Sequence, residues 1–131
     1  MQITRNIVPE FTDERGSITK ILDDGQTSIK SVLMIVSKAG SVRANHYHKE
    51  DGHHVYMVSG KMEYIEAPLV EGQPDHSRET RAELTAGDLV FSPPMVAHAM
   101  RFIEDTTWVV LALKSRSQEN YEQDTVRVKL V

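Results

Sequence analysis

The chain contains no cysteine. This absence excludes disulfides and thiolate metal ligands, so any bound metal must be held by nitrogen and oxygen donors, which suit iron, manganese, nickel, copper or zinc. A surplus of positive charge is missing as well, because 15 Lys and Arg stand against 19 Asp and Glu, for a net charge of −4. With no long basic run either, nothing supports binding to nucleic acid.

Long apolar stretches are also missing. No run approaches the roughly 20 residues that a membrane-spanning helix needs, and the first residues lack the charged start and apolar segment of a secretory signal. We therefore expect a soluble, cytoplasmic protein with no membrane partner. A length of 131 residues is enough for a hydrophobic core, and no linker or repeat divides it, which predicts a single domain over residues 1–131.

Helical periodicity is scarce too. Short apolar or alternating runs recur instead, each ended by turn residues, and this pattern is typical of an all-β barrel or sandwich. The predicted strands are Ser17–Leu22, Ile29–Ser37, Arg43–His48, His53–Val58, Lys61–Glu66, Thr80–Thr85, Leu89–Phe91, His98–Phe102, Thr106–Lys114 and Thr125–Val131. The turn at Ser59 and Gly60 predicts a hairpin, residues 67–78 are predicted to form a loop, and 115–123 are the one candidate for a helical turn.

Histidine is the residue type that stands out. Among the six histidines, His46, His48 and His53 fall within eight residues, and His98 follows a turn with two prolines. Residues two apart on a strand point to the same face, so the first two rings can meet at one point. We therefore predict that a divalent transition metal is held by His46, His48, His53 and His98. His54 should point to the opposite face of its strand.

Apolar residues share the strand faces of these histidines. Val55 and Met57 follow His53 at even spacing, and Met100 and Phe102 follow His98 in the same way. These four side chains are predicted to form an apolar wall behind the metal, as small-molecule sites generally have. Trp108 is expected to pack in the core.

Two spaced motifs resemble those of the cupin family. The residues that match are Gly40, His46, His48 and Gly60 in the first motif (40–60), and Gly87, Pro93 and His98 in the second (87–102). The resemblance implies a cupin-type, jelly-roll β-barrel. His53 stands where the first motif normally has Glu, and Met95 and Phe102 stand where the second has Gly and Asn.

The exchange of Glu for His53 changes the charge of the predicted site. Three imidazoles and a carboxylate would leave a divalent ion at a net charge of +1, whereas four neutral imidazoles leave it at +2, a stronger Lewis acid. An anionic substrate would complement that charge, and Arg43 is a candidate to clamp its carboxylate or phosphate. Two alternatives stay open: His53 could lie outside the metal's ligands, and Arg43 could be a solvated charge at a strand end.

A second resemblance is narrower. The segments Phe11-Thr-Asp-Glu-Arg15-Gly16 and Arg43-Ala-Asn-His46-Tyr-His48-Lys49 are similar to motifs of the cupin-type nucleotide-sugar epimerases and ketoisomerases. This resemblance implies that the paired histidines do acid–base work on a keto sugar, often without a metal. Ala44 departs from the glycine of that motif, and the additional histidines favour a metal.

The main functional hypothesis is a metal-binding cupin enzyme that acts on a small, polar, anionic molecule. The expected chemistry is isomerisation or epimerisation of a sugar or keto compound, with His48, His98 and Arg43 as catalytic residues. One alternative is a metal-dependent dioxygenase, and another is a ligand- or metal-binding sensor module without turnover. Because Gln2–Val8 and Thr125–Val131 alternate like open sheet edges, and cupins commonly pair their sheets, we also expect a homodimer.

Overall fold

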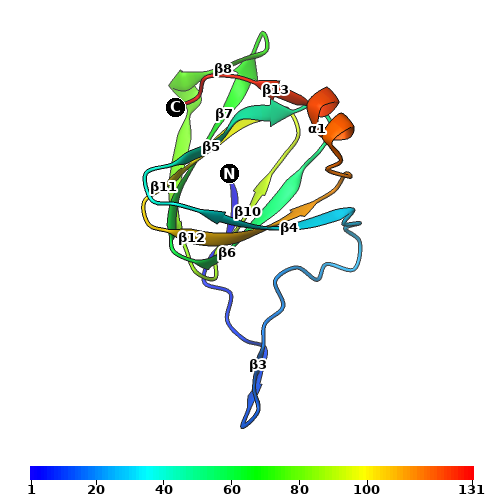
Figure 1. The fold of residues 1–131 in the computed structure, drawn as a ribbon, viewed down its shortest axis with the longest axis vertical. Helices are drawn as coiled ribbons and strands as arrows, with labels where there is room; N and C mark the ends of the chain where they lie inside the picture. Colours follow the sequence, from blue (N-terminus) through cyan, green and yellow to red (C-terminus); the bar gives the residue numbers. More distant parts are fainter.

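Two antiparallel β-sheets curl around a common interior in the computed structural model, which describes residues 1–131 (Figure 1). The first sheet has the strand order β1 (Gln2–Thr4), β10 (Leu89–Ser92), β6 (His53–Ser59), β12 (Thr106–Ala112) and β4 (Ser31–Ser37). The second sheet has the order β13 (Thr125–Arg127), β5 (Val42–His48), β11 (Val96–Phe102), β7 (Lys61–Val70) and β8 (Gln73–Pro74), with β9 (Thr80–Thr85) also paired to β7. The predicted all-β barrel is confirmed.

The remaining elements lie outside these sheets. They are the hairpin β2 (Phe11–Asp13) and β3 (Gly16–Ile18), the 3-10 turn η1 (His76–Arg78), and the helix α1 (Gln118–Asp124). The helix overlaps the segment 115–123 predicted to contain a helical turn and ends one residue beyond it, and it lies beside the end of β5 (Figure 1). No helix of the structure is long and apolar enough to cross a membrane.

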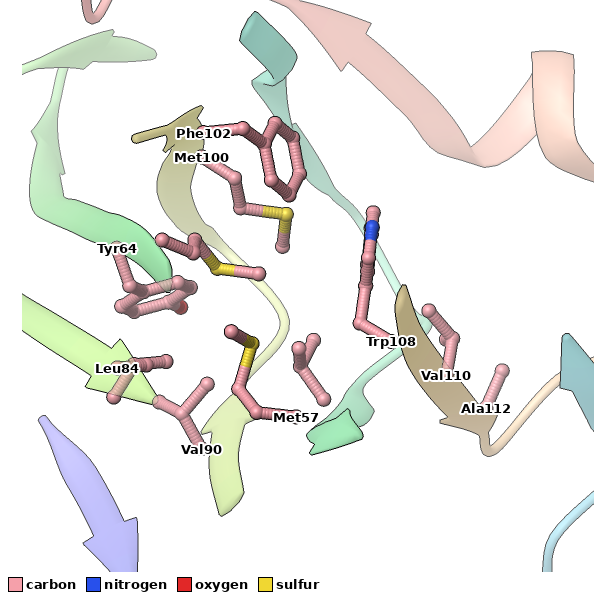
Figure 2. Close-up of a cluster of buried hydrophobic side chains, with 11 residues drawn as sticks. Met57, Tyr64, Leu84, Val90, Met100, Phe102, Trp108, Val110 and Ala112 are labelled. Atoms are coloured by element: carbon pink, nitrogen blue, oxygen red, sulfur yellow. The ribbon is translucent and has the colours of Figure 1, made fainter. Parts of the chain in front are cut away.

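The core fills the space between the two sheets. Alternate residues of β12 are buried, which places Trp108 and Val110 inside, and Figure 2 shows these side chains facing residues from the other strands. The cluster consists of Val55, Met57, Met62, Tyr64, Leu84, Val90, Met100, Phe102, Trp108, Val110 and Ala112. The predicted apolar wall is therefore part of the main core, and each large side chain in it contributes about 1.5–3 kcal/mol by burial.

The predicted hairpin at Ser59 and Gly60 is wrong. β6 pairs with β10 and β12 in the first sheet, whereas β7 pairs with β8, β9 and β11 in the second. The chain therefore crosses from one sheet to the other at Gly60, which has a φ of 93°. Only glycine adopts this left-handed conformation without strain. Gly60 therefore forms a turn, as predicted, but the two strands that it joins belong to different sheets.

Residues 67–78, predicted as a loop, are partly strand. β7 continues to Val70 and pairs with β8, and Pro68 lies opposite Val96 in the ladder. Proline lacks only the donor of a ladder hydrogen bond, and the carbonyl of Pro68 still accepts from the backbone N–H of Asp75 at 2.8 Å.

The strand predicted over Ser17–Leu22 is also mostly wrong. Only its first two residues belong to β3, which pairs with β2 in a hairpin that stands away from the barrel (Figure 1). Asp13 closes the turn by accepting a hydrogen bond from the backbone N–H of Arg15 at 2.9 Å.

Gly60→Ala should destabilise the fold far more than Gly25→Ala. Both glycines have a positive φ, but a Cβ at Gly60 would overlap the backbone of Asp105 and Thr106, whereas nothing lies within 4 Å of one at Gly25. We expect a loss in the free energy of unfolding of about 2–4 kcal/mol for Gly60→Ala and about 1 kcal/mol for Gly25→Ala. Urea denaturation measures both, and equal losses would contradict the close packing at the crossing.

Candidate functional site

Both sheets contribute histidines to one buried cluster. His46 and His48 lie on β5, His98 lies on β11 directly opposite His46, and His53 begins β6 in the other sheet. The ring centroids of His46 lie 4.6 Å from His48 and 4.7 Å from His98, and those of His53 lie 5.1 Å from His98 and 5.5 Å from His48. The structure therefore brings all four predicted histidines together. The ring of His54 packs on Phe91 instead.

A bulge in β5 positions these side chains. Ala44 and Asn45 have left-handed backbones with φ of 70° and 57°, and the register with β11 shifts between His98 and Ala99. The amide oxygen of Asn45 accepts hydrogen bonds from the backbone N–H groups of Leu130 and Val131 at 3.2 and 3.0 Å. Asparagine tolerates the left-handed region, and a bulge of this kind bends a strand and redirects its side chains.

Four ring nitrogens in the cluster have no hydrogen-bond partner. They are buried and comprise Nδ1 of His46 and His53 and Nε2 of His48 and His98. The Nδ1 atom of His48 lies 3.3 Å from Thr125 Oγ1 and 3.4 Å from Asp124 Oδ2, and that of His98 lies 3.4 Å from the carbonyl of Val96. The carboxylate and the carbonyl accept only, and so favour the Nδ1–H tautomer, which leaves the Nε2 atoms of His48 and His98 with a free lone pair.

Three of the clustered histidines form a candidate set of metal ligands. One ring nitrogen from each of His46, His48 and His98 lies within 4.8 Å of the other two, so the rings would move slightly inward to bond one ion at about 2.0–2.1 Å. His53 is not a member of this group of three, although its ring adjoins two of the others. A three-histidine set therefore fits the geometry, and His53 as a fourth ligand stays a prediction.

Burial keeps these imidazoles neutral. Removal from water lowers the pKa of His46 to about 2, that of His48 to about 4 and that of His98 to about 3, and it lowers the pKa of His53 well below its ordinary value. Repulsion from the Arg116 guanidinium lowers all four further. Metals bind the neutral imidazole, so protons do not compete for the cluster near pH 7.

Asp124, the last residue of α1, links the helix to the histidine strand. Its carboxylate accepts hydrogen bonds from the backbone N–H groups of Glu50 and Asp51 at 2.7 and 3.1 Å, and it lies beside His48 Nδ1. A carboxylate in this position orients an imidazole and makes its other nitrogen more basic. Sequence reasoning missed Asp124 because no motif spacing connects it to the histidines.

A cavity of about 530 Å³ adjoins the cluster at His48. Its lining is His48, Lys49, Glu50, Asp51, Lys114, Ser115, Arg116, Asn120, Tyr121, Gln123 and Asp124. The ring of Tyr121 lies 6.2 Å from that of His46 and 6.0 Å from that of His48, so α1 covers the approach to the histidines. Arg116 and Tyr121 were also missed, and the one helical segment of a β-rich chain was the available signal.

Arg43 lies elsewhere. It pairs with Met100 across the ladder, and its Nε donates a hydrogen bond to Ser37 Oγ at 2.9 Å, next to the indole of Trp108, which donates to the same oxygen. Arg43 does not line the cavity beside the histidines. The role of Arg43 as a clamp for an anion stays a prediction, and no contact between Arg43 and the histidine cluster supports it.

Comparison with protein-family models matches residues 19–130 to the family described as Cupin. Because the match covers most of the chain, the protein belongs to the cupin family, as its two motifs predicted. No curated protein sequence matches the chain.

Several solved structures share the fold. A dTDP-4-dehydrorhamnose 3,5-epimerase from Sulfolobus tokodaii is 19% identical, with a TM-score of 0.74 over 92% of this chain and 73% of the other. A 3,4-ketoisomerase from Helicobacter canadensis is 21% identical, with a TM-score of 0.73 over 96% of this chain and 89% of the other. A mutant 3,4-ketoisomerase from Thermoanaerobacterium thermosaccharolyticum, in complex with TDP-4-keto-6-deoxyglucose, is 19% identical. Its TM-score is 0.71 over 96% of this chain and 87% of the other. At these identities the likeness establishes the fold.

Acid should destabilise the metal-free protein. The folded pKa of each clustered histidine lies below its unfolded value of 6.5, so below pH 6.5 the unfolded chain binds more protons. The free energy of unfolding should therefore fall as the pH falls from 6.5 towards 4, by up to about 1.4 kcal/mol per pH unit for each histidine. Urea denaturation with a chelator present measures this slope.

Two variants, His46→Gln and His76→Gln, test whether the clustered histidines cause this dependence of the free energy of unfolding on pH. His46 is buried in the cluster, whereas the side chain of His76 is exposed on η1. His46→Gln should make the acid slope shallower, and His76→Gln should leave it unchanged. Equal slopes in all three proteins would mean that the clustered histidines do not cause the acid sensitivity.

Proposed function

We propose that this protein is a metal-binding cupin enzyme that isomerises or epimerises a small, anionic sugar or keto compound. The observation that carries the proposal is the set of buried, unpartnered imidazole nitrogens beside a charged cavity. Buried polar atoms are ordinarily hydrogen-bonded, and an exception of this size is typical of a site that binds a group from outside the chain.

Each histidine has a role in this proposal. His46, His48 and His98 would hold the ion, and Asp124 would keep His48 in the tautomer that offers Nε2. A divalent metal bound there would supply Lewis-acid polarisation of a substrate carbonyl. His53, whose ring lies next to this group, would be the fourth ligand, because its strongly lowered pKa suits a neutral metal ligand better than a base.

The proposed reaction class rests on two supports. The approach to the histidines is lined almost entirely by polar and charged side chains, with Tyr121 as the one apolar contact. Such a lining suits a hydroxylated, charged substrate better than an apolar one. The structural neighbours include sugar epimerases and ketoisomerases, and the N-terminal and histidine motifs resemble the same group.

A metal-free version of this chemistry is the second candidate, and the His48–Asp124 contact favours it. A carboxylate behind an imidazole stabilises its charged form, which helps the imidazole to act as a base. Burial nevertheless lowers the pKa of His48 to about 4, whereas an efficient general base is tuned close to the working pH. This mismatch is the reason that we prefer the metal-binding role for His48.

His48→Ala should weaken metal binding by at least about 100-fold, because it removes one ligand of three or four. Titration of the metal-free protein with Co²⁺, followed by its visible absorption, measures this effect without any substrate. His54→Ala is the matched control, since His54 neighbours the cluster in sequence but faces Phe91. A His48→Ala variant that binds Co²⁺ as tightly as the control would overturn the metal proposal.

Activity then separates the remaining alternatives. The metal-free candidate predicts solvent deuterium exchange into TDP-4-keto-6-deoxyglucose by chelator-treated protein, with loss of exchange in His48→Ala. Oxygen uptake by the Fe²⁺-loaded protein would favour the dioxygenase. Tight metal binding without a position that exchanges with added ligands would favour the sensor module.

We also propose a homodimer, formed by the outer face of the first sheet. On the edge strand β4, Val32, Met34 and Val36 are 65%, 73% and 65% exposed. The hairpin β2–β3 carries exposed Phe11 and Ile18 and stands away from its own barrel (Figure 1). In a dimer, the β2–β3 hairpin of each copy would pack on the exposed apolar side of β4 in the other copy. Such a reciprocal contact is the self-complementarity that a two-fold interface requires.

Light scattering should report a dimer at micromolar concentration, and Met34→Lys should shift it towards monomer. A lysine there would bury a charge in the proposed interface. Val70→Lys is the control, because Val70 is also half exposed but lies at the end of β7 in the other sheet. A monomeric wild-type protein, or equal effects of the two lysines, would contradict the proposed surface.

A further inference from the structure

We propose that Arg116, supported by Tyr121, binds an oxyanion of the substrate at the mouth of the histidine cluster and so selects carboxylated or phosphorylated compounds. The proposal rests on the proposed function in one respect, namely that the cluster acts on a small molecule. Neither residue belongs to a motif in the sequence, and both come from the segment between β12 and β13.

The first observation is an unsatisfied donor. The Nε atom of Arg116 is buried and has no hydrogen-bond partner. No carboxylate in the chain forms an ion pair with its guanidinium either. A buried guanidinium donor without an acceptor is unfavourable, so this atom calls for an acceptor from outside the chain.

The second observation is how the guanidinium is held. Its central carbon lies 4.8 Å from the centre of the Tyr121 ring. The ring covers one face of the guanidinium by a cation–π contact, so the N–H groups in its plane remain available. Two parallel N–H donors match the paired oxygens of a carboxylate or a phosphate, which a lysine cannot do.

The third observation is the charge that lines the cavity. The acids Asp51 and Asp124 are occupied, since Asp51 accepts from the backbone N–H of Lys114 at 3.0 Å and Asp124 accepts from those of Glu50 and Asp51. Three cations, Lys49, Lys114 and Arg116, line the same cavity without forming an ion pair, against one acid without a partner, Glu50. The balance of unpaired charge beside the histidines is therefore positive.

The position of Arg116 also fits a role in selecting the substrate. Tyr121 lies about equally far from His46 and His48, so the guanidinium on that ring sits one aromatic ring away from the cluster. A ligand held there by an oxyanion would present the rest of its carbon chain to the histidines. Keto acids and phosphorylated keto sugars meet this description, whereas neutral sugars do not.

Calorimetric titration of the protein with three probes tests this inference. Fructose 6-phosphate and 2-ketogluconate each carry an oxyanion and a keto group, and fructose is the neutral match. We expect at least one oxyanion probe to bind and fructose not to bind. The two oxyanion probes separate a preference for phosphate from one for carboxylate. Arg116→Gln should weaken the binding by about 10- to 100-fold.

Two further variants distinguish recognition from general charge. Arg116→Lys keeps the charge but loses the paired donors, so it should recover only part of the affinity. Arg101→Gln removes an exposed, ion-paired arginine that does not line the cavity, and it should bind like the wild type. Arg116→Gln should also bind Co²⁺ normally, which separates this inference from the metal proposal.

The inference is overturned if the wild type binds no oxyanion probe, if fructose binds as well as fructose 6-phosphate, or if Arg116→Gln and Arg101→Gln bind alike. If the wild type binds no Co²⁺ but loses oxyanion binding on Arg116→Gln, the metal proposal fails and the anion subsite stands. If Co²⁺ binds and the oxyanion probes do not, the anion subsite fails and the metal proposal stands.

Discussion

The structure depends on the burial of four neutral imidazoles, each with one ring nitrogen that has no hydrogen-bond partner in the chain. An unsatisfied buried polar group costs about 1–3 kcal/mol, and the whole stability of a domain is about 5–15 kcal/mol. The cluster therefore consumes a substantial part of the stability that the core supplies. Whatever group binds these nitrogens restores that stability, so folding and ligand binding are thermodynamically linked here.

The cluster requires strands that are not regular. If β5 had no bulge, Arg43 and His46 would lie on opposite faces, because they are an odd number of residues apart. The register shift at His98 and the left-handed Ala44 and Asn45 bring Arg43 opposite Met100, whose side chain is in the core. The bulge thus turns Arg43 to the inner face of the sheet, where its Nε donates to Ser37 Oγ.

Local patterns predicted the parts of the fold that depend on neighbours in sequence. Period-two spacing placed His46 and His48 on one face and His54 on the other, and the motif spacing brought His98 to them. Gly60 is different, because a left-handed glycine fits both a hairpin and a crossing between sheets. The packing of Asp105 and Thr106 against Gly60 determines that the chain crosses between the sheets there. Asp124 and Arg116 reach the site through contacts that no spacing along the chain encodes.

The division between strands and helix has a functional consequence. The barrel supplies the imidazoles, and barrels of this shape occur in proteins that share only about a fifth of their sequence with this one. A fold reused so widely does not determine the reaction by itself. In this chain Asp124 contacts His48, and Arg116 and Tyr121 cover the approach to the histidines, all from the short segment after β12. Because that segment carries no strand-pairing constraint of the barrel, it can change without loss of the fold. On the proposed function, α1 and the residues just before it select the substrate, while the histidines of the barrel carry the chemistry.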